Sequence, residues 1–168
     1  HGFTHLTKTL PPTYSIVIPA YNESTRIRTS LDRVIAFANQ HQWNAEILVV
    51  NDGSSDDTAQ ILQEYAARHP IVRLLQNPGN RGKGYSVRNG MLHATGEILL
   101  FSDADLSSPI EEADKLFAAL NQGADVAFGS RFLPQRPRLP AGTFGNRVNE
   151  VDRTRVLQIA QAVLDRID

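Results

Sequence analysis

The sequence predicts an α/β domain organised around a mostly parallel sheet that is flanked by helices. The first observation is a set of five short runs rich in Ile, Leu and Val, which lack the alternation typical of half-exposed strands. Such runs are typical of strands covered on both faces, as in parallel sheets. The second observation is that segments with helical periodicity separate these runs. The predicted strands are residues 14–20, 45–52, 71–77, 96–103 and 124–131.

Two helices are expected between the first three strands. The first, over residues 24–40, is expected to begin near Ser24, because Ser is common at helix starts. The second, over residues 56–69, is expected to use Asp56 and Asp57 as caps, since carboxylates stabilise the amino end of a helix. Their inward stripes are expected to be Ile27, Leu31, Val34, Ile35 and Ala38, and then Ile61, Leu62, Tyr65 and Ala66.

Three more helices are expected further along the chain. The first spans residues 83–95, and the second spans residues 109–122, opening with Pro109 and closing at Gly123, as helices favour. Residues 150–167 carry a third apolar stripe. The chain is therefore divided into a tail (1–10), an α/β domain (11–132), a Pro- and Arg-containing linker (133–149) and a C-terminal helix (150–168).

Composition excludes several classes of protein. The net charge of −1 predicts no nucleic-acid partner. Cysteine is absent, which excludes disulfides and thiolate metal sites and fits a reducing compartment. No apolar stretch approaches the roughly 18–20 residues that span a bilayer, and the polar opening HGFTHLTKTLPP is unlike a secretion signal. We therefore expect a cytoplasmic location.

Polar segments begin where each predicted strand ends. In open parallel sheets, the ligand crevice lies at the carboxyl ends of the strands. Segments at five such ends would therefore meet in one site. In chain order they are PAYNES, NDGSSDD, NPGNRGKG, DADLSSP and GSRF.

Asp103 and Asp105 are the clearest candidates for metal ligands. In extended backbone their side chains would point to one side, where two carboxylates repel each other unless a cation lies between them. Mg²⁺ or Mn²⁺ suits this position, because each accepts a few protein oxygens while substrate phosphates complete its shell. The alternative is an exposed Asp103 and an Asp105 that caps the helix after Pro109. The position beside four other polar segments favours the metal.

Other candidates have both a ligand and a structural interpretation. Asp52 could accept a hydrogen bond from a base or a ribose, or it could simply belong to an Asn-Asp-Gly turn. Arg81 and Lys83 lie in a Gly-rich loop before a helix, where backbone amides and cations could hold a phosphate. Arg131 could also hold a phosphate, or it could lie on the surface.

Taken in order, the segments YSIVIPAYNES, AEILVVNDGSSDDT, NRGKGYSVRNGMLHATGEILLFSDADLSSP and ADVAFGSR resemble the catalytic domain of family 2 glycosyltransferases with a GT-A fold. Within that family, NRGKG and DADLSSP are most similar to the dolichyl-phosphate β-glucosyltransferases and their bacterial polyprenyl-phosphate relatives. The resemblance covers about residues 14–132. The expected fold is therefore a Rossmann-like GT-A sheet within a nucleotide-sugar-binding catalytic domain.

The resemblance also implies roles for individual residues. Asp52 would meet the base, and Lys83 the region between base and phosphates. The residues that would bind the nucleotide are Pro19, Ala20, Tyr21, Glu23, Asp52, Arg81, Lys83 and Asp103. The metal ligands would be Asp103, Asp105 and Ser107, and the catalytic residues Asp103, Asp105 and Arg131, with Arg131 facing the acceptor phosphate.

The implied reaction is an inverting, Mg²⁺- or Mn²⁺-dependent transfer of a hexose, with glucose from UDP-glucose expected, to a polyprenyl or dolichyl phosphate. It would occur at the cytoplasmic face of a membrane, with peripheral contact. An acceptor-binding half like that of the family is not recognisable after GSRF. Two alternatives stay open: a transferase for a polysaccharide or soluble acceptor, and a nucleotide-binding module without catalysis. A nicotinamide dehydrogenase is not supported, because PAYNES lacks G-x-G-x-x-G.

Overall fold

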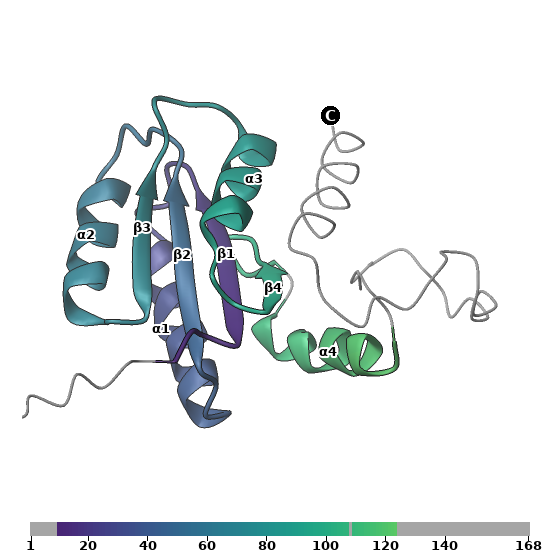
Figure 1. The fold of residues 1–168 in the computed structure, drawn as a ribbon. Coiled ribbons are helices and arrows are strands. Elements are labelled where there is room, and N and C mark those ends of the chain that lie inside the picture. Colours follow the sequence, from purple (N-terminus) through teal and green to yellow (C-terminus); the bar gives the residue numbers. More distant parts are fainter. Residues whose placement is uncertain (1–9, 108, 124–168) are drawn as a thin grey trace, which may run out of the picture.

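The computed structural model describes residues 10–107 and 109–123, which form a four-stranded sheet with helices on both faces (Figure 1). In chain order the elements are β1 (Tyr14–Ala20), α1 (Ile27–Gln40), β2 (Ala45–Asn51), α2 (Thr58–Arg68), β3 (Val72–Gln76), α3 (Lys83–His93), β4 (Ile98–Phe101), the 3-10 helix η1 (Ile110–Glu112) and α4 (Ala113–Asn121). No helix in this described part is long and apolar enough to cross a membrane. The predicted strand 124–131, linker 133–149 and helix 150–168 lie outside the described residues, as do residues 1–9 of the tail.

The four strands are parallel and lie in the order β3-β2-β1-β4, which confirms the predicted sheet type. The register places Ile16 of β1 beside Ile47 of β2 and Leu100 of β4. The chain moves outward from β1 to β2 and β3, and then crosses to the other side of β1 for β4. Open parallel sheets bind ligands where the strand order reverses in this way. The reversal lies between β1 and β4.

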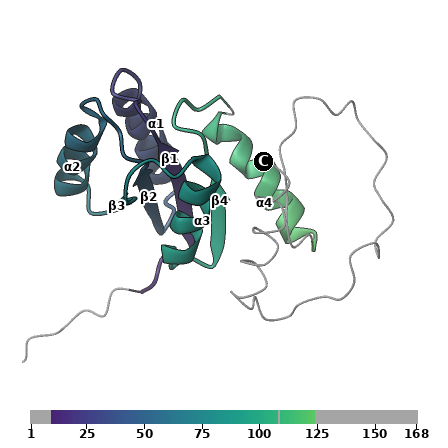
Figure 2. The ribbon, with the colours of Figure 1, turned by 90° about the horizontal axis from the view of Figure 1, so that it is seen from above.

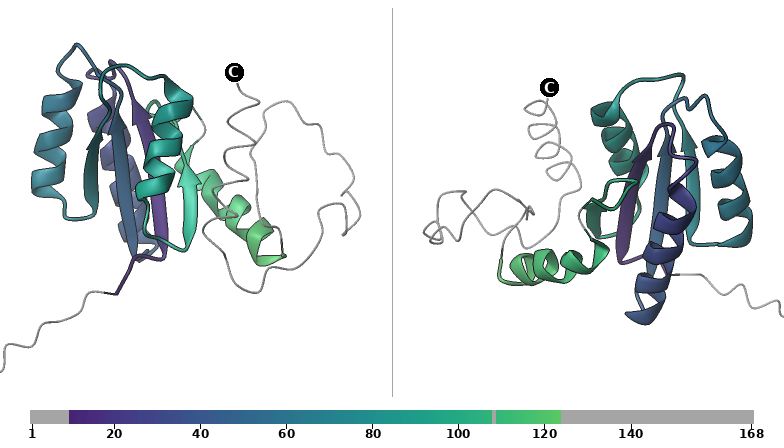
Figure 3. Two further views of the ribbon diagram at one scale, coloured as in Figure 1. Left: turned by 45° about the horizontal axis from the view of Figure 1, so that its top comes forward. Right: turned by 180° about the vertical axis from the view of Figure 1, so that it is seen from behind.

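Both faces of the sheet are covered, as the apolar strands predict (Figure 3). Ile16 and Ile18 of β1 point into a core shared with α1 and α2, whereas Val17 points into a smaller core on the α3 side. A Cβ atom at Gly90 of α3 would overlap a methyl group of Val17. Glycine at this position therefore lets α3 lie directly on β1.

An aromatic cluster joins α4 to the amino end of the sheet. The ring centroid of Trp43 lies 4.6 Å from that of Tyr14 and 5.1 Å from that of Phe117 in α4. The ring of Phe37 in α1 packs against the same indole in an edge-to-face arrangement. Because Trp43 is the single tryptophan of the chain, its fluorescence reports on this cluster.

The largest differences from the predicted helix boundaries are in α1 and in the segment after β4. α1 begins at Ile27 rather than near Ser24, because residues 23–26 form a turn in which the carbonyl of Glu23 accepts the N–H of Ile27. The predicted helix 109–122 is divided into η1 and α4. The expected inward residues of α1 are all buried in the structure.

Glu46 is a buried carboxylate at the amino end of the sheet. It accepts hydrogen bonds from Ser15 Oγ at 2.6 Å and from Thr95 N at 2.6 Å, and it pairs with Arg73. Burial acts to raise the pKa of Glu46, but the hydrogen bonds from Ser15, Thr95 and Arg73 outweigh burial and lower it. The ionised carboxylate therefore ties β1, β2, β3 and the α3–β4 connection together.

We expect Glu46→Gln to lower the free energy of unfolding at pH 7 by about 2–3 kcal/mol, because charged hydrogen bonds are lost. A folded-state pKa that is lowered gives stability above the unfolded pKa and loses it as the pH falls. The difference between wild type and variant should therefore shrink as the pH falls below the ordinary pKa of Glu, 4.5. Urea unfolding followed by Trp43 fluorescence at several pH values measures this, with exposed Glu97→Gln as control. A constant difference across pH would contradict the explanation.

Candidate active site

Four loops follow the carboxyl ends of the strands and gather at one edge of the sheet, onto which Figure 2 looks. We name them loop 1 (residues 21–26), loop 2 (52–57), loop 3 (77–82) and loop 4 (102–107). The predicted site residues on the described part of the chain lie on these loops or directly beside them. Each loop contacts the next, so the four loops form a closed circuit.

Loops 1 and 2 are joined first through Asn22. Its backbone N–H donates to Ser54 Oγ at 3.0 Å, and its side-chain Oδ1 accepts the N–H of Ser55 at 2.8 Å. Asn22 has a φ of 52°, a left-handed conformation that asparagine tolerates better than most residues. The Asn of the PAYNES segment thus shapes the turn and holds loop 2 against it.

Asp56 makes the second connection between loops 1 and 2. One carboxylate oxygen accepts the N–H and hydroxyl of Thr58, and the other accepts the N–H of Ser24. Partial burial acts to raise the pKa of Asp56, but the hydrogen bonds from Thr58 and Ser24 hold it well below its usual range. Asp56 therefore caps the first residue of α2, as predicted, whereas Asp57 makes no side-chain cap bond. The predicted cap by Asp57 is wrong, because its side chain accepts no cap bond; Asp56 binds the N–H of Thr58 instead.

Asp52 joins loop 2 to loop 3. It is only 4% exposed, and its Oδ1 accepts hydrogen bonds from Asn77 Nδ2 and from the N–H of Arg81, both at 2.8 Å. Its Oδ2 accepts the N–H of Gly82 at 2.8 Å. The carboxylate thus fixes the Gly-rich loop just before α3. A contact between Asp52 and a base remains a prediction, and it would have to be made by a carboxylate that already has three donors.

Glycine permits the close approach of loops 2 and 3. Gly53 has a φ of +68°, and a Cβ atom there would lie 2.6 Å from the carbonyl carbon of Gly79 and 2.7 Å from the nitrogen of Asn80. Any larger residue at position 53 would force the two backbones apart. The Asn-Asp-Gly turn therefore serves the contact between loops as well as the turn itself.

A buried polar network continues from Asp52 into α3. Asn77 is 7% exposed, and its Nδ2 lies 2.9 Å from Ser86 Oγ, which in turn donates to the carbonyl of Gly82. Asn77 Oδ1 accepts a hydrogen bond from Asn89 at 2.9 Å. Buried polar groups stabilise a structure only when they are paired, and these groups are paired. The amino end of α3 is thereby fixed in position.

Lys83, the first residue of α3, directly follows loop 3 and joins it to loop 4. Its Nζ lies 2.5 Å from Asp103 Oδ1 and 5.3 Å from the centre of the Phe101 ring. Both charged side chains are partly exposed, at 60% for Lys83 and 30% for Asp103. A cation of the Gly-rich segment and a carboxylate of the DADLSSP segment thus meet, as the convergence of the polar segments predicted.

Loop 4 corrects the prediction that strand geometry aligns the two aspartates. β4 ends at Phe101, short of the predicted residue 103, and Asp103 and Asp105 lie in a turn closed by a hydrogen bond from Leu106 N to the Asp103 carbonyl. Ser107 brings the carboxylates together instead, since its hydroxyl donates to Asp103 and its N–H donates to Asp105. The alternative role of Asp105 as a helix cap is not seen, because η1 has no side-chain cap bond.

Arg26 closes the circuit between loops 4 and 1. Its Nε donates to Glu23 Oε2 at 2.9 Å, its Nη2 lies 2.8 Å from the same oxygen, and its Nη1 lies 3.9 Å from Asp105 Oδ2. This contact spans the reversal between β1 and β4. Glu23 and Asp105, both predicted site residues, are therefore connected by a side chain that was not predicted.

Asp103 and Asp105 have the chemistry of a site for Mg²⁺ or Mn²⁺. Carboxylate oxygens are the ligands that hard divalent cations prefer, and both side chains are accessible, at 30% and 38% exposed. Among the described residues, no three His, Cys, Asp or Glu side chains are grouped for metal binding. A cation held by this pair would therefore depend on phosphate and water oxygens for its other ligands, as the sequence predicts.

The other predicted ligands occupy varied positions. Pro19 and Ala20 are the last two residues of β1 and are buried, whereas Tyr21 is 47% exposed at the start of loop 1. Arg81 bends its side chain back, and its Nε donates to the carbonyl of Pro78. Arg131 lies outside the described residues. Direct contact of any of these residues with a ligand remains a prediction.

Arg26 and Asn77 take part in the circuit, but the sequence did not predict a role for either. Arg26 is one of the two arginines of the segment STRIR, and nothing in the pattern shows which one turns toward loop 4. Asn77 precedes Pro78 and reads as an ordinary turn residue. Its place directly after an apolar strand, like that of Asp52, is the signal that could have identified it.

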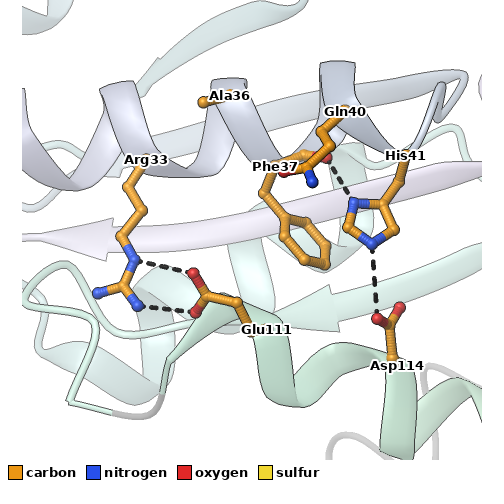
Figure 4. A pocket seen from close by; sticks show the side chains of 7 residues that line it. All are labelled: Arg33, Ala36, Phe37, Gln40, His41, Glu111 and Asp114. Atoms are coloured by element: carbon orange, nitrogen blue, oxygen red, sulfur yellow. Dashed lines mark hydrogen bonds and ion pairs between the residues drawn. The ribbon is translucent and has the colours of Figure 1, made fainter.

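A shallow hollow lies elsewhere, between α1 and the η1–α4 segment (Figure 4). There Arg33 and Glu111 form a bidentate ion pair at 2.8 and 3.1 Å, and His41 Nε2 lies 3.5 Å from Asp114. These pairs hold η1 and α4 on α1. The hollow contains none of the predicted site residues; it is lined by Arg33, Ala36, Phe37, Gln40, His41, Glu111 and Asp114.

Comparison with known proteins identifies the family. Residues 15–160 match the family model described as glycosyl transferase family 2. A dolichyl-phosphate beta-glucosyltransferase of Drosophila melanogaster is 42% identical over 130 residues, covering 70% of this chain and 40% of that protein. An undecaprenyl-phosphate 4-deoxy-4-formamido-L-arabinose transferase of Edwardsiella ictaluri is 41% identical over 115 residues, covering 67% of this chain and 35% of that protein.

A solved structure supports the same assignment. A mannosyltransferase from Pyrobaculum calidifontis, in complex with GDP-Man and Mn²⁺, is 30% identical with a TM-score of 0.51, covering 62% of this chain and 30% of that chain. The fold is of the GT-A type, as the sequence predicted. The chain spans less than half the length of these curated relatives. Because the match to the family model extends over most of the sequence, the chain belongs to glycosyl transferase family 2.

Proposed function

We propose that this chain binds a nucleotide-diphosphate sugar with a divalent cation at the four loops and transfers the hexose to a polyprenyl phosphate. The observation that carries the proposal is the closed circuit of loops across the reversal between β1 and β4. Two carboxylates of this circuit, Asp103 and Asp105, lie beside the cationic side chains of Lys83 and Arg26. Such a reversal is the usual ligand position in open parallel sheets. Family membership supports a nucleotide-sugar as the ligand.

Each part of the donor has a candidate partner in the circuit. Asp103 and Asp105 would hold the cation, and Ser107 would keep the two carboxylates aligned, because it donates to both. The cation would act as a Lewis acid and neutralise charge on the departing diphosphate. Lys83 would lie beside the phosphates, and Tyr21 and Glu23 of loop 1 would line the nucleotide pocket.

The acceptor needs little activation in this reaction. A lipid phosphate is ionised at neutral pH, so an oxygen of the phosphate attacks the anomeric carbon as the bond to the diphosphate breaks. The attack comes from the opposite face, which inverts the anomeric centre. Positioning and electrostatics then supply most of the barrier reduction, and no general base is assigned. Arg131 is proposed to face the acceptor phosphate.

UDP-glucose is the proposed donor and dolichyl or polyprenyl phosphate the proposed acceptor. The support is the name of the Drosophila relative, a dolichyl-phosphate beta-glucosyltransferase, together with the undecaprenyl-phosphate acceptor in the name of the bacterial one. A lipid acceptor would require contact with a membrane surface, which we propose to be the cytoplasmic face.

Calorimetry and a transfer assay test the proposal. We expect UDP to bind the chain in the presence of Mn²⁺ and to bind at least about tenfold more tightly than UMP, because the β-phosphate shares the cation. GDP serves as the base control. In the transfer assay, label from UDP-glucose should enter an organic-extractable product only when both polyprenyl phosphate and Mn²⁺ or Mg²⁺ are present.

The outcomes separate the alternatives. Failure of UDP and GDP to bind with either cation would overturn the donor site. Binding of UDP without transfer to lipid would leave a donor-binding module, and label in an added oligosaccharide instead would indicate a soluble acceptor. Either result would overturn the lipid-phosphate transferase.

A further inference from the structure

Arg26 occupies an unusual place in the circuit. It reaches from loop 1 across the reversal of strand order, with Nη1 at 3.9 Å from Asp105 Oδ2. Its side chain is 57% exposed, so it can take other positions, yet Glu23 Oε2 holds the guanidinium through a hydrogen bond from Nε and an ion pair with Nη2. A long cation is thus tethered beside a candidate metal ligand without being fixed to it.

Both candidate metal ligands face a cation of this chain. Lys83 pairs with Asp103 from the loop 3 side, and Arg26 approaches Asp105 from the loop 1 side. Oδ1 of Asp105 accepts the N–H of Ser107, so Oδ2, which Arg26 approaches, is the oxygen turned toward loop 1. A divalent cation on that oxygen would meet the positive charge of the guanidinium at short range, which is unfavourable.

We propose that Arg26 is a displaceable counter-ion of Asp105, which leaves the carboxylate for the diphosphate and thereby couples nucleotide binding to metal binding. The inference rests on the proposed function, because it assumes a diphosphate and a cation at these loops. The planar fork of arginine suits a phosphate better than a single carboxylate oxygen at 3.9 Å. Glu23 keeps the guanidinium within reach of loop 4 in either position.

The position of Arg26 would differ between the free protein and the protein with a bound diphosphate. Without a diphosphate, Arg26 stays beside Asp105 and weakens cation binding. With a diphosphate, Arg26 moves to the phosphate and Asp105 Oδ2 becomes available. By thermodynamic linkage, the cation must then strengthen nucleotide binding by the same factor as the nucleotide strengthens cation binding.

The test is a titration of the chain with Mn²⁺ alone and with Mn²⁺ in the presence of UDP, measuring free Mn²⁺ by electron paramagnetic resonance. Arg26→Gln should bind Mn²⁺ alone about three- to tenfold more tightly than wild type, because one nearby positive charge is removed. The factor by which UDP tightens Mn²⁺ binding should fall at least as much. Arg26→Lys keeps the charge but loses the fork, so Mn²⁺ alone should bind as in wild type and only the coupling should fall.

Arg28→Gln is the matched control. It removes the same charge two residues away, from a side chain that is 48% exposed and paired with Glu64 of α2. Equal effects of the two glutamine variants, no effect of either, or weaker Mn²⁺ binding by Arg26→Gln would overturn the inference. Wild type that binds UDP and Mn²⁺ normally in that experiment would leave the proposed function standing. Wild type that binds no UDP would instead overturn both.

Discussion

Replacing Asp105 by asparagine should weaken Mn²⁺-dependent binding of UDP by about a hundredfold, because the cation loses one of its two anionic protein ligands. Asp103→Asn should have a similar effect, with the added release of Lys83 from its ion pair. Both side chains are partly exposed, so neither variant is expected to unfold the domain. Calorimetric titration of UDP at a fixed Mn²⁺ concentration measures the loss, and the transfer assay should lose activity in parallel.

Asp114→Asn is the control for these two variants. It removes a carboxylate of the same type from α4, where the side chain faces His41 in the hollow and not the loops. Its UDP affinity should equal that of wild type. Retention of Mn²⁺-dependent binding by both Asp103→Asn and Asp105→Asn would exclude the pair as metal ligands and would require another site for the cation.

The second large effect is expected from Asp52→Ala. The substitution leaves the buried amide of Asn77 and the partly buried N–H groups of Arg81 and Gly82 without their acceptor. Each such loss costs roughly 1–3 kcal/mol, so we expect the free energy of unfolding to fall by about 3 kcal/mol or more. Urea unfolding followed by Trp43 fluorescence measures it. UDP binding should be lost as well, because loop 3 is no longer held.

Two further variants make this prediction specific. Asp52→Asn should also be destabilising, since its amide group would face backbone N–H donors and could accept from only part of them. Asp57→Ala, on the same loop but exposed and without a side-chain cap bond, should change the free energy of unfolding by less than about 0.5 kcal/mol. If Asp52→Ala were as mild as Asp57→Ala, the hydrogen bonds of Asp52 would not support loop 3.

The fold was largely predictable because its strongest signals are local. Apolar runs covered on both faces define β1, β2 and β3, and helical stripes define α1 and α2. Helix ends were less predictable. Ser24 has a typical start signal, but residues 24–26 form a turn ahead of the helix, and the N–H of Ser24 donates to Asp56 of another loop. A contact between residues 32 positions apart leaves no trace in a local pattern.

The candidate site was predictable as a set of loops but not as a set of bonds. The topology of a parallel sheet is enough to bring the segments of Asp52, Lys83 and Asp103 together. Which carboxylate accepts from which donor depends on side-chain packing in three dimensions. For this reason the sequence predicted either a ligand or a turn residue at Asp52, whereas the structure shows a buried acceptor for the N–H groups of loop 3.

The closed circuit of loops has a consequence for the energetics of recognition. Ordering a flexible loop costs conformational entropy, and a protein that orders its loops only when a ligand arrives loses that amount from the affinity. Here the turns of loops 1, 2 and 3 are already tied to one another by hydrogen bonds, of which those of Asp56 to Ser24 and of Asp52 to Gly82 are partly buried. Most of the ordering takes place during folding, so the rim is preorganised and an incoming ligand meets a surface that is nearly in its final shape.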